Sequence, residues 1–159
     1  SEFIRNYFKP KHDITKPVDK LFENLRSTND MIIGVHIRQT DYQTYLNGKF
    51  YFTIDDYYNW IFQLNSELNN INKCFLISSD TKLDNNYFKD FNINIFSGEP
   101  LQAMYALSSC DYIFGPPSSF SAWSAFYGEK PLCVLNSKNI VLKISDFIVL
   151  KYPDNPECL

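Results

Sequence analysis

Short runs of apolar residues, many of them Val and Ile, alternate along the chain with longer segments whose apolar residues recur at helical spacing. Such runs are typical of buried strands, and the longer spacing is typical of amphipathic helices. The pattern predicts strands at 31–38, 73–79, 93–96, 111–114 and 132–135, and a short apolar segment at 147–150. It predicts helices at about 17–25, 54–68, 100–109 and 118–127, and a helix or loop at 85–91.

Local signals mark several helix ends. Pro17 fits a first helical position, where a missing N–H costs nothing. Thr53 and Asp56 have the spacing of a capping box, and Ser118 or Ser119 can cap the helix that follows. Gly128 stands where a helix commonly stops.

Strands that alternate with helices favour an α/β fold, a doubly wound parallel sheet with helices on both faces and right-handed crossovers. The length of 159 residues predicts one domain, at 1–150, followed by a tail or linker at 151–159. A hydrophobic content of 45% and an aromatic content of 17% favour a packed globule over disorder.

Composition narrows the partners and the compartment. The net charge is −3 and the basic residues are scattered, which argues against nucleic acid. Four cysteines without a Cys-x-x-Cys pair predict reduced thiols, no metal site and a cytoplasmic protein, with the inner membrane face as a second option. No apolar run approaches the roughly 18 residues of a membrane span, and the chain opens on no signal peptide.

The most informative stretch runs from 32 to 42, an apolar strand that ends in polar residues. Open α/β sheets bind ligands at the carboxyl ends of their strands. The fork-shaped guanidinium of Arg38 suits a phosphate there. The alternative is a solvated arginine with Asp41 as its ion-pair partner. His36 either donates to the phosphate, orients Arg38 or is a satisfied core residue.

Two more loops follow strands that are expected to end at the same edge. Ser79 and Asp80 follow the second strand, where Asp80 either caps a helix or accepts hydrogen bonds from a base or ribose. Ser118 and Ser119 open a helix whose free N–H groups can bind an anion, although serine is also a common cap. Three such loops together predict a site for a phosphate and a base.

Aromatic residues near these loops have two interpretations. Trp60 and Trp123 lie on apolar helical faces and are expected in the core. The loop that carries Tyr42, Tyr45 and Phe52 can stack on a sugar or a base, or pack against a neighbouring domain.

These residues resemble the donor-binding half of fucosyltransferases, especially the α-1,2-fucosyltransferase family, and the wider group with a His-x-Arg-Arg-x-Asp motif. The match is at His36, Arg38, Asp41 and Tyr42. A strand ending at Ser79-Asp80 is similar to the second motif. The run Ser118-Ser119-Phe120-Ser121-Ala122-Trp123 is similar to the third.

The resemblance implies half of a two-domain GT-B enzyme, GDP-fucose as donor, an oligosaccharide or glycan as acceptor, inverting transfer and no required metal. It implies that His36, Arg38, Ser79, Asp80, Ser118, Ser119 and Phe120 hold the donor, and that Arg38 and Asp41 act in catalysis.

Two departures from the family pattern stand out. Gln39 replaces the second arginine of the motif, and nothing in the chain resembles the N-terminal half. Two other functions therefore stay open, a non-catalytic nucleotide-binding module and a flavodoxin-like interaction domain.

Overall fold

A six-stranded sheet forms the centre of the protein. We describe residues 2–150 of the chain in a computed structural model. The strand order is β3-β2-β1-β4-β5-β6. The strands are β1 (Met31–Ile37), β2 (Lys73–Ser79), β3 (Ile93–Ile95), β4 (Tyr112–Gly115), β5 (Pro131–Val134) and β6 (Ile148–Val149). All pairings are parallel except that of β5 with β6.

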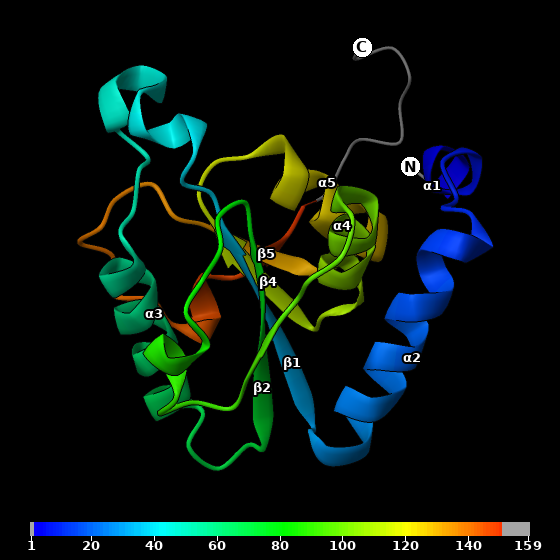
Figure 1. Cartoon of the computed structure of the whole chain (residues 1–159), viewed down its shortest axis with the longest axis horizontal. Helices are drawn as coiled ribbons and strands as arrows, with labels where there is room; N and C mark the ends of the chain where they lie inside the picture. Colours follow the sequence, from blue (N-terminus) through cyan, green and yellow to red (C-terminus); the bar gives the residue numbers. More distant parts are fainter. Residues whose placement is uncertain (1, 151–159) are drawn as a thin grey trace.

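Helices cover both faces of this sheet (Figure 1). One layer contains α2 (His12–Thr28), α4 (Pro100–Ser109) and α5 (Ser119–Gly128), and the other contains α3 (Ile54–Glu67). Shorter elements are α1 (Glu2–Tyr7), η1 (Asp41–Gln43), η2 (Tyr45–Gly48), η3 (Asn85–Phe88) and η4 (Ile144–Asp146). The expected doubly wound α/β fold is confirmed. The one difference in the sheet is its antiparallel edge strand, β6, which falls within the apolar segment expected at 147–150.

Strand β1 contributes to both hydrophobic cores because successive side chains point to opposite faces. Ile33, Val35 and Ile37 pack with α3, whereas Ile32 packs with α2 and α4. Gly34 lies against Leu107 of α4. This two-sided burial explains the near-continuous apolar sequence of β1.

Helix α2 begins earlier than its sequence predicts. The prediction that Pro17 is the first helical residue is wrong, because α2 starts at His12 and Pro17 lies inside it. The missing N–H of Pro17 removes one hydrogen bond in the second turn. Burial of Val18 and Phe22 against the sheet offsets that loss.

The other helix-end signals have mixed outcomes. Thr53 and Asp56 form the expected reciprocal capping box of α3, and Ser118 caps α5. Gly128 does end α5, but the left-handed residue after the helix is Glu129, with φ 55°. Glycine is required at 128 for another reason, since a Cβ there would lie 2.0 Å from the carbonyl oxygen of Ser108. Gly128 therefore lets α5 approach the end of α4.

Within residues 2–150 no helix is both long and apolar enough to cross a membrane. Cys74, Cys110 and Cys133 are buried free thiols, as expected. The tail predicted at 151–159, which includes Cys158, lies outside the described residues.

We expect Gly128→Ala to lower the free energy of unfolding by about 2 kcal/mol, because the methyl group meets backbone that cannot easily move. Gly34→Ala is the comparison, since its Cβ would lie 2.9 Å from the Cδ2 atom of Leu107, the end of a flexible side chain. Urea unfolding of both variants measures the difference. An equal loss for the two would show that the helix–helix contact at Gly128 is not special.

Candidate functional site

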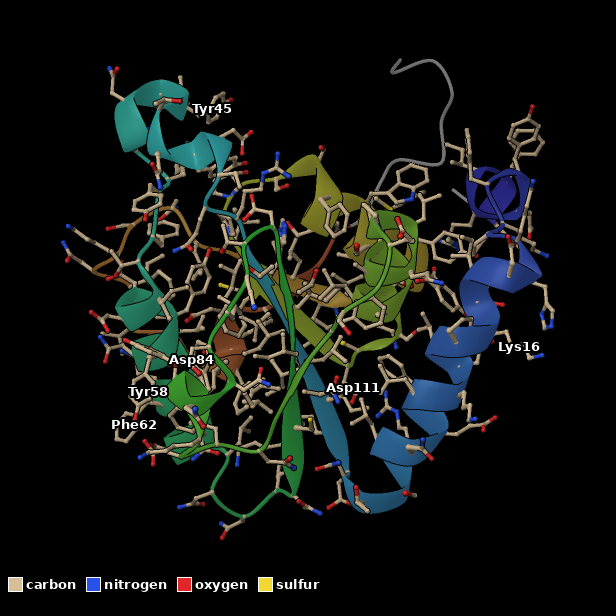
Figure 2. The ribbon with its side chains drawn as sticks, viewed as in Figure 1. Lys16, Tyr45, Tyr58, Phe62, Asp84 and Asp111 are labelled. Atoms are coloured by element: carbon tan, nitrogen blue, oxygen red, sulfur yellow. The ribbon has the colours of Figure 1, made fainter. Side chains whose placement is uncertain are left out.

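The carboxyl ends of β1, β2 and β4 lie next to one another, as the sequence predicts. Segment 41–52 rises from this edge beside the start of α5 (Figure 1). Tyr45 projects from the outer end of that segment (Figure 2). Polar residues from three separate loops therefore meet at one edge of the sheet.

Arg38 follows the last residue of β1 and is held by Asp41. Its Nε donates to Asp41 Oδ1 at 2.8 Å, and its Nη2 donates to Asp41 Oδ2 at 3.0 Å. The guanidinium also lies 5.8 Å from the centre of the Tyr42 ring, which is a cation–π distance. Among the described residues the Nη1 atom has no hydrogen-bond partner. Arg38 is thus fixed in direction while one edge of its guanidinium stays available.

Asp80 organises the loop that carries Arg38. Its carboxylate accepts hydrogen bonds from the backbone N–H groups of Gln39 and Thr40, at 2.8 and 3.2 Å, and from the Thr40 hydroxyl at 2.6 Å. Arg38 Nε lies 3.6 Å from Asp80 Oδ2. The geometry gives Asp80 a role in shaping this loop, and contact with a base or ribose stays a prediction.

Gln39 and Ser79 point into the protein. The Gln39 amide donates to the carbonyl of Phe52 at 3.0 Å, and its oxygen accepts from the hydroxyl of Thr81 at 3.2 Å. Ser79 Oγ accepts from the backbone N–H of Thr81 at 3.1 Å. Gln39 therefore holds the end of segment 41–52 at Phe52.

His36 is buried behind Phe120. It is 4% exposed, its Nδ1 atom has no hydrogen-bond partner among the described residues, and its ring lies 5.0 Å from the Phe120 ring. Burial, assisted by the positive charge of Arg38, lowers the pKa of His36 to about 4. The imidazole is therefore neutral at pH 7.

The start of α5 faces the same edge. Ser118 Oγ accepts from the backbone N–H of Phe120 at 3.2 Å, so the serine acts as a cap. The Tyr42 hydroxyl donates to the carbonyl of Pro117 and ties segment 41–52 to this turn. The amino end of a ten-residue helix carries a partial positive charge, which favours an anion nearby.

A cavity of about 510 Å³ lies between Arg38 and the start of α5; we call it the anion cavity. Of the site residues expected from sequence, Arg38, Asp41, Ser118, Ser119 and Phe120 line it. His36, Ser79 and Asp80 do not line it. The remaining lining residues are Tyr42, Tyr45, Met104 and Trp123.

Two of these lining residues were not expected at a site. Trp123 was expected in the core, but it is half-buried and faces the cavity, whereas Trp60 is in the core as expected. Met104 belongs to α4 and carried no signal, because a methionine on an amphipathic helix resembles any core residue. The position of Trp123 in the third motif was the signal that could have identified it. Within residues 2–150 no group of three or more His, Cys, Asp or Glu side chains is placed to hold a metal ion.

The low pKa of His36 predicts a specific acid sensitivity. Between pH 6.5 and about 4 the unfolded chain binds a proton at residue 36 that the folded chain does not, so stability falls as the pH falls. From pH 7 to pH 5 we expect this residue to cost about 2 kcal/mol. Urea unfolding at both values should show a smaller loss for His36→Leu than for the wild type. His12→Leu, which alters the other histidine of the chain, should keep the full loss.

No protein-family model and no curated protein matches the sequence. Several solved structures match the fold. The fucosyltransferase NodZ from Bradyrhizobium matches with a TM-score of 0.58 and 17% identity, over 78% of this chain and 44% of NodZ. A mutant of Arabidopsis thaliana FUT1 in complex with GDP matches with a TM-score of 0.55 and 15% identity, over 79% of this chain and 34% of FUT1.

POFUT1 in its apo form matches with a TM-score of 0.60 and 11% identity, over 84% of this chain and 49% of POFUT1. The chain spans less than half the length of each of these three proteins. At such low identities the similarity establishes the fold. The protein has a fucosyltransferase-like α/β fold, matching part of each of these larger proteins.

Proposed function

We propose that this chain is the donor-binding domain of a fucosyltransferase that transfers fucose from GDP-fucose to a sugar hydroxyl with inversion, and that it needs no metal ion. The observation that carries the proposal is the anion cavity, where Arg38 and the capped start of α5 face one space. The fold supports it, because similar structures include fucosyltransferases, one of them in complex with GDP. The motif residues His36, Arg38 and Asp41 support the assignment to the His-x-Arg-Arg-x-Asp group, with the α-1,2 family as the nearest resemblance.

In this proposal the diphosphate of the donor lies between Arg38 and the turn at Ser118-Ser119. The Nη1 edge of Arg38 and the free N–H groups of α5 stabilise the negative charge that develops on the leaving diphosphate. These fixed donors take the place of a cation. His36 does not contact the diphosphate in this proposal. Its neutral imidazole packs against the ring of Phe120, which forms part of the cavity wall.

Asp41 is the candidate general base, and its environment makes it a weak one. Hydrogen bonds from Arg38 lower the pKa of the Asp41 carboxyl below its ordinary value, so it has less affinity for a proton. Arg38 occupies one site on each oxygen of Asp41, and the side chain is 55% exposed, so a free lone pair can still accept a hydrogen bond from an acceptor hydroxyl. We propose that Asp41 first of all holds Arg38 in place. Its action as the general base is the second part of the proposal.

The pairing of Asp41 with Arg38 favours a second candidate function, a nucleotide-binding module without catalysis. Both oxygens of Asp41 are paired with Arg38, and Asp41 is the one carboxylate among the described residues that line the anion cavity. A domain of this kind can hold a nucleotide sugar without activating an acceptor.

Arg38→Ala should weaken GDP binding at least about tenfold, because a charge-assisted contact to phosphate is lost. Calorimetric titration in EDTA measures this and tests metal independence in the same experiment. Lys16→Ala is the matched control, since Lys16 projects into solvent from α2, away from the anion cavity (Figure 2). Unchanged affinity in Arg38→Ala would remove Arg38 from the site, and binding that EDTA abolishes would contradict a metal-free site.

The chain by itself should show at most trace transfer of radiolabelled fucose from GDP-fucose to oligosaccharides. A transferase must hold donor and acceptor in attack geometry, and we propose that a second domain supplies the acceptor side. Robust turnover would contradict the need for that domain. GDP binding without transfer, in turn, would agree with both the donor-binding domain and the binding module.

A further inference from the structure

Segment 41–52, which rises beside the start of α5, has an unusual backbone at its tip. Leu46 and Asn47 have φ values of 48° and 56°, and Gly48 has a φ value of 73°. Three consecutive residues therefore adopt the left-handed conformation, which residues other than glycine rarely adopt. Leucine is unfavourable there, because its Cβ crowds the following carbonyl oxygen. The tip of the segment is thus held in a strained conformation.

Few contacts outside the segment hold this tip in place. Among the helices and strands, η2 packs mainly on η1, which belongs to the same segment. The anchors of the segment lie elsewhere, since the Tyr42 hydroxyl bonds to the Pro117 carbonyl and Gln39 holds Phe52. Residues 43–47 between these anchors are exposed. A strained, exposed tip with few contacts opens locally at a low cost in free energy.

Asn47 is followed by Gly48, and this pair is the one Asn-Gly sequence in the chain. Asn47 is exposed, and its side chain makes no hydrogen bond to any other described residue. Gly48 has no side chain that could block the approach of its own backbone nitrogen to the asparagine amide. These features together favour deamidation of Asn47.

Deamidation needs only these two residues and water. When the tip opens, the backbone nitrogen of Gly48 attacks the Cγ atom of Asn47. A bond forms between these two atoms, the bond from Cγ to Nδ2 breaks, and the side-chain nitrogen leaves as ammonia with the proton of the Gly48 nitrogen. Water then opens the cyclic imide at either of its carbonyl groups, which gives aspartate or isoaspartate. Both products carry a negative charge that asparagine lacks.

The new charge lies close in sequence to residues that line the anion cavity. Tyr45, two positions before Asn47, lines this cavity, and its ring lies 5.4 Å from the ring of Tyr42. Asp41 already places a carboxylate in the cavity wall, where it is paired with Arg38. A second carboxylate on the same segment repels a bound anion, and isoaspartate also lengthens the backbone of the tip.

We infer that Asn47 is a modification site, whose spontaneous deamidation lowers the affinity of the anion cavity for a nucleoside diphosphate. The modification itself depends only on the tip of segment 41–52. Its effect on binding rests on the proposed function. The affinity of the protein for its anionic ligand therefore falls with the age of the molecule.

Mass spectrometry of aged protein tests the modification. The whole chain is incubated at mildly alkaline pH, and trypsin then releases residues 39–49 as one peptide. This peptide should carry a severalfold larger deamidated fraction than the peptide with Asn136. Asn136 is the internal control, because it is also exposed but precedes a serine and has no positive φ. A deamidated fraction at Asn47 no larger than that at Asn136 would overturn the modification site.

Calorimetric titration with GDP tests the effect on binding. Asn47→Asp introduces the charge of the modified protein, so it should weaken GDP binding roughly twofold to fivefold at low ionic strength and less at high ionic strength. Asn70→Asp is the matched control and should leave the affinity unchanged. Asn70 is exposed and lies just before β2, at the opposite edge of the sheet.

Ageing of two proteins links the modification to the affinity. Wild-type protein should lose GDP affinity during the incubation, whereas Asn47→Gln, which keeps an amide but forms its cyclic imide far more slowly, should retain it. An equal loss in both would overturn deamidation as the cause, and deamidation without loss would overturn its effect on the anion cavity. If fresh protein fails to bind GDP, the proposed function and the effect on binding are both overturned, and mass spectrometry decides the modification separately.

Discussion

The position of β1 is the constraint on which the rest of the structure depends. It pairs with β2 on one side and β4 on the other, and helices cover both of its faces. A strand in that environment has no solvent-facing side, so its sequence is nearly all apolar until it ends. Apart from the buried His36, the chain becomes polar at Arg38, where it leaves the sheet. The central position of β1 in the sheet therefore explains both the burial of the strand and the place of the Arg38 guanidinium.

The position of Arg38 at the end of β1 does not by itself orient its guanidinium. Hydrogen bonds from the neighbouring loops do so. Asp80, just after the end of β2, accepts the N–H groups of Gln39 and Thr40, so the loops after the two strands act as one unit. Asp41 then pairs with the guanidinium through both of its oxygens. These four charge-assisted contacts hold an exposed loop in one conformation more effectively than a single surface ion pair would.

The opposite edge of the sheet is fixed by another arginine and aspartate. Asp111, beside the end of α2 in Figure 2, accepts from Arg26 at 2.7 and 2.9 Å and from the backbone N–H of Ile32 at 2.7 Å. These contacts join α2 to the first residues of β1 and to the start of β4. At the site edge the polar groups also hold loops together, but the Nη1 atom of Arg38 has no hydrogen-bond partner among the described residues and is available for a ligand.

The sequence by itself determined the alternating strands and helices, because burial period and capping chemistry are local: Thr53, Asp56 and Ser118 act as predicted. It also placed Arg38 and the start of α5 at one edge. Only the tertiary structure decided which side chains line the cavity, because that depends on how loops from distant positions pack. Asp80 and Gln39 bond to loop residues instead of facing the cavity. Gly128 packs against the carbonyl group of Ser108, and the half-exposed Trp123 lines the anion cavity.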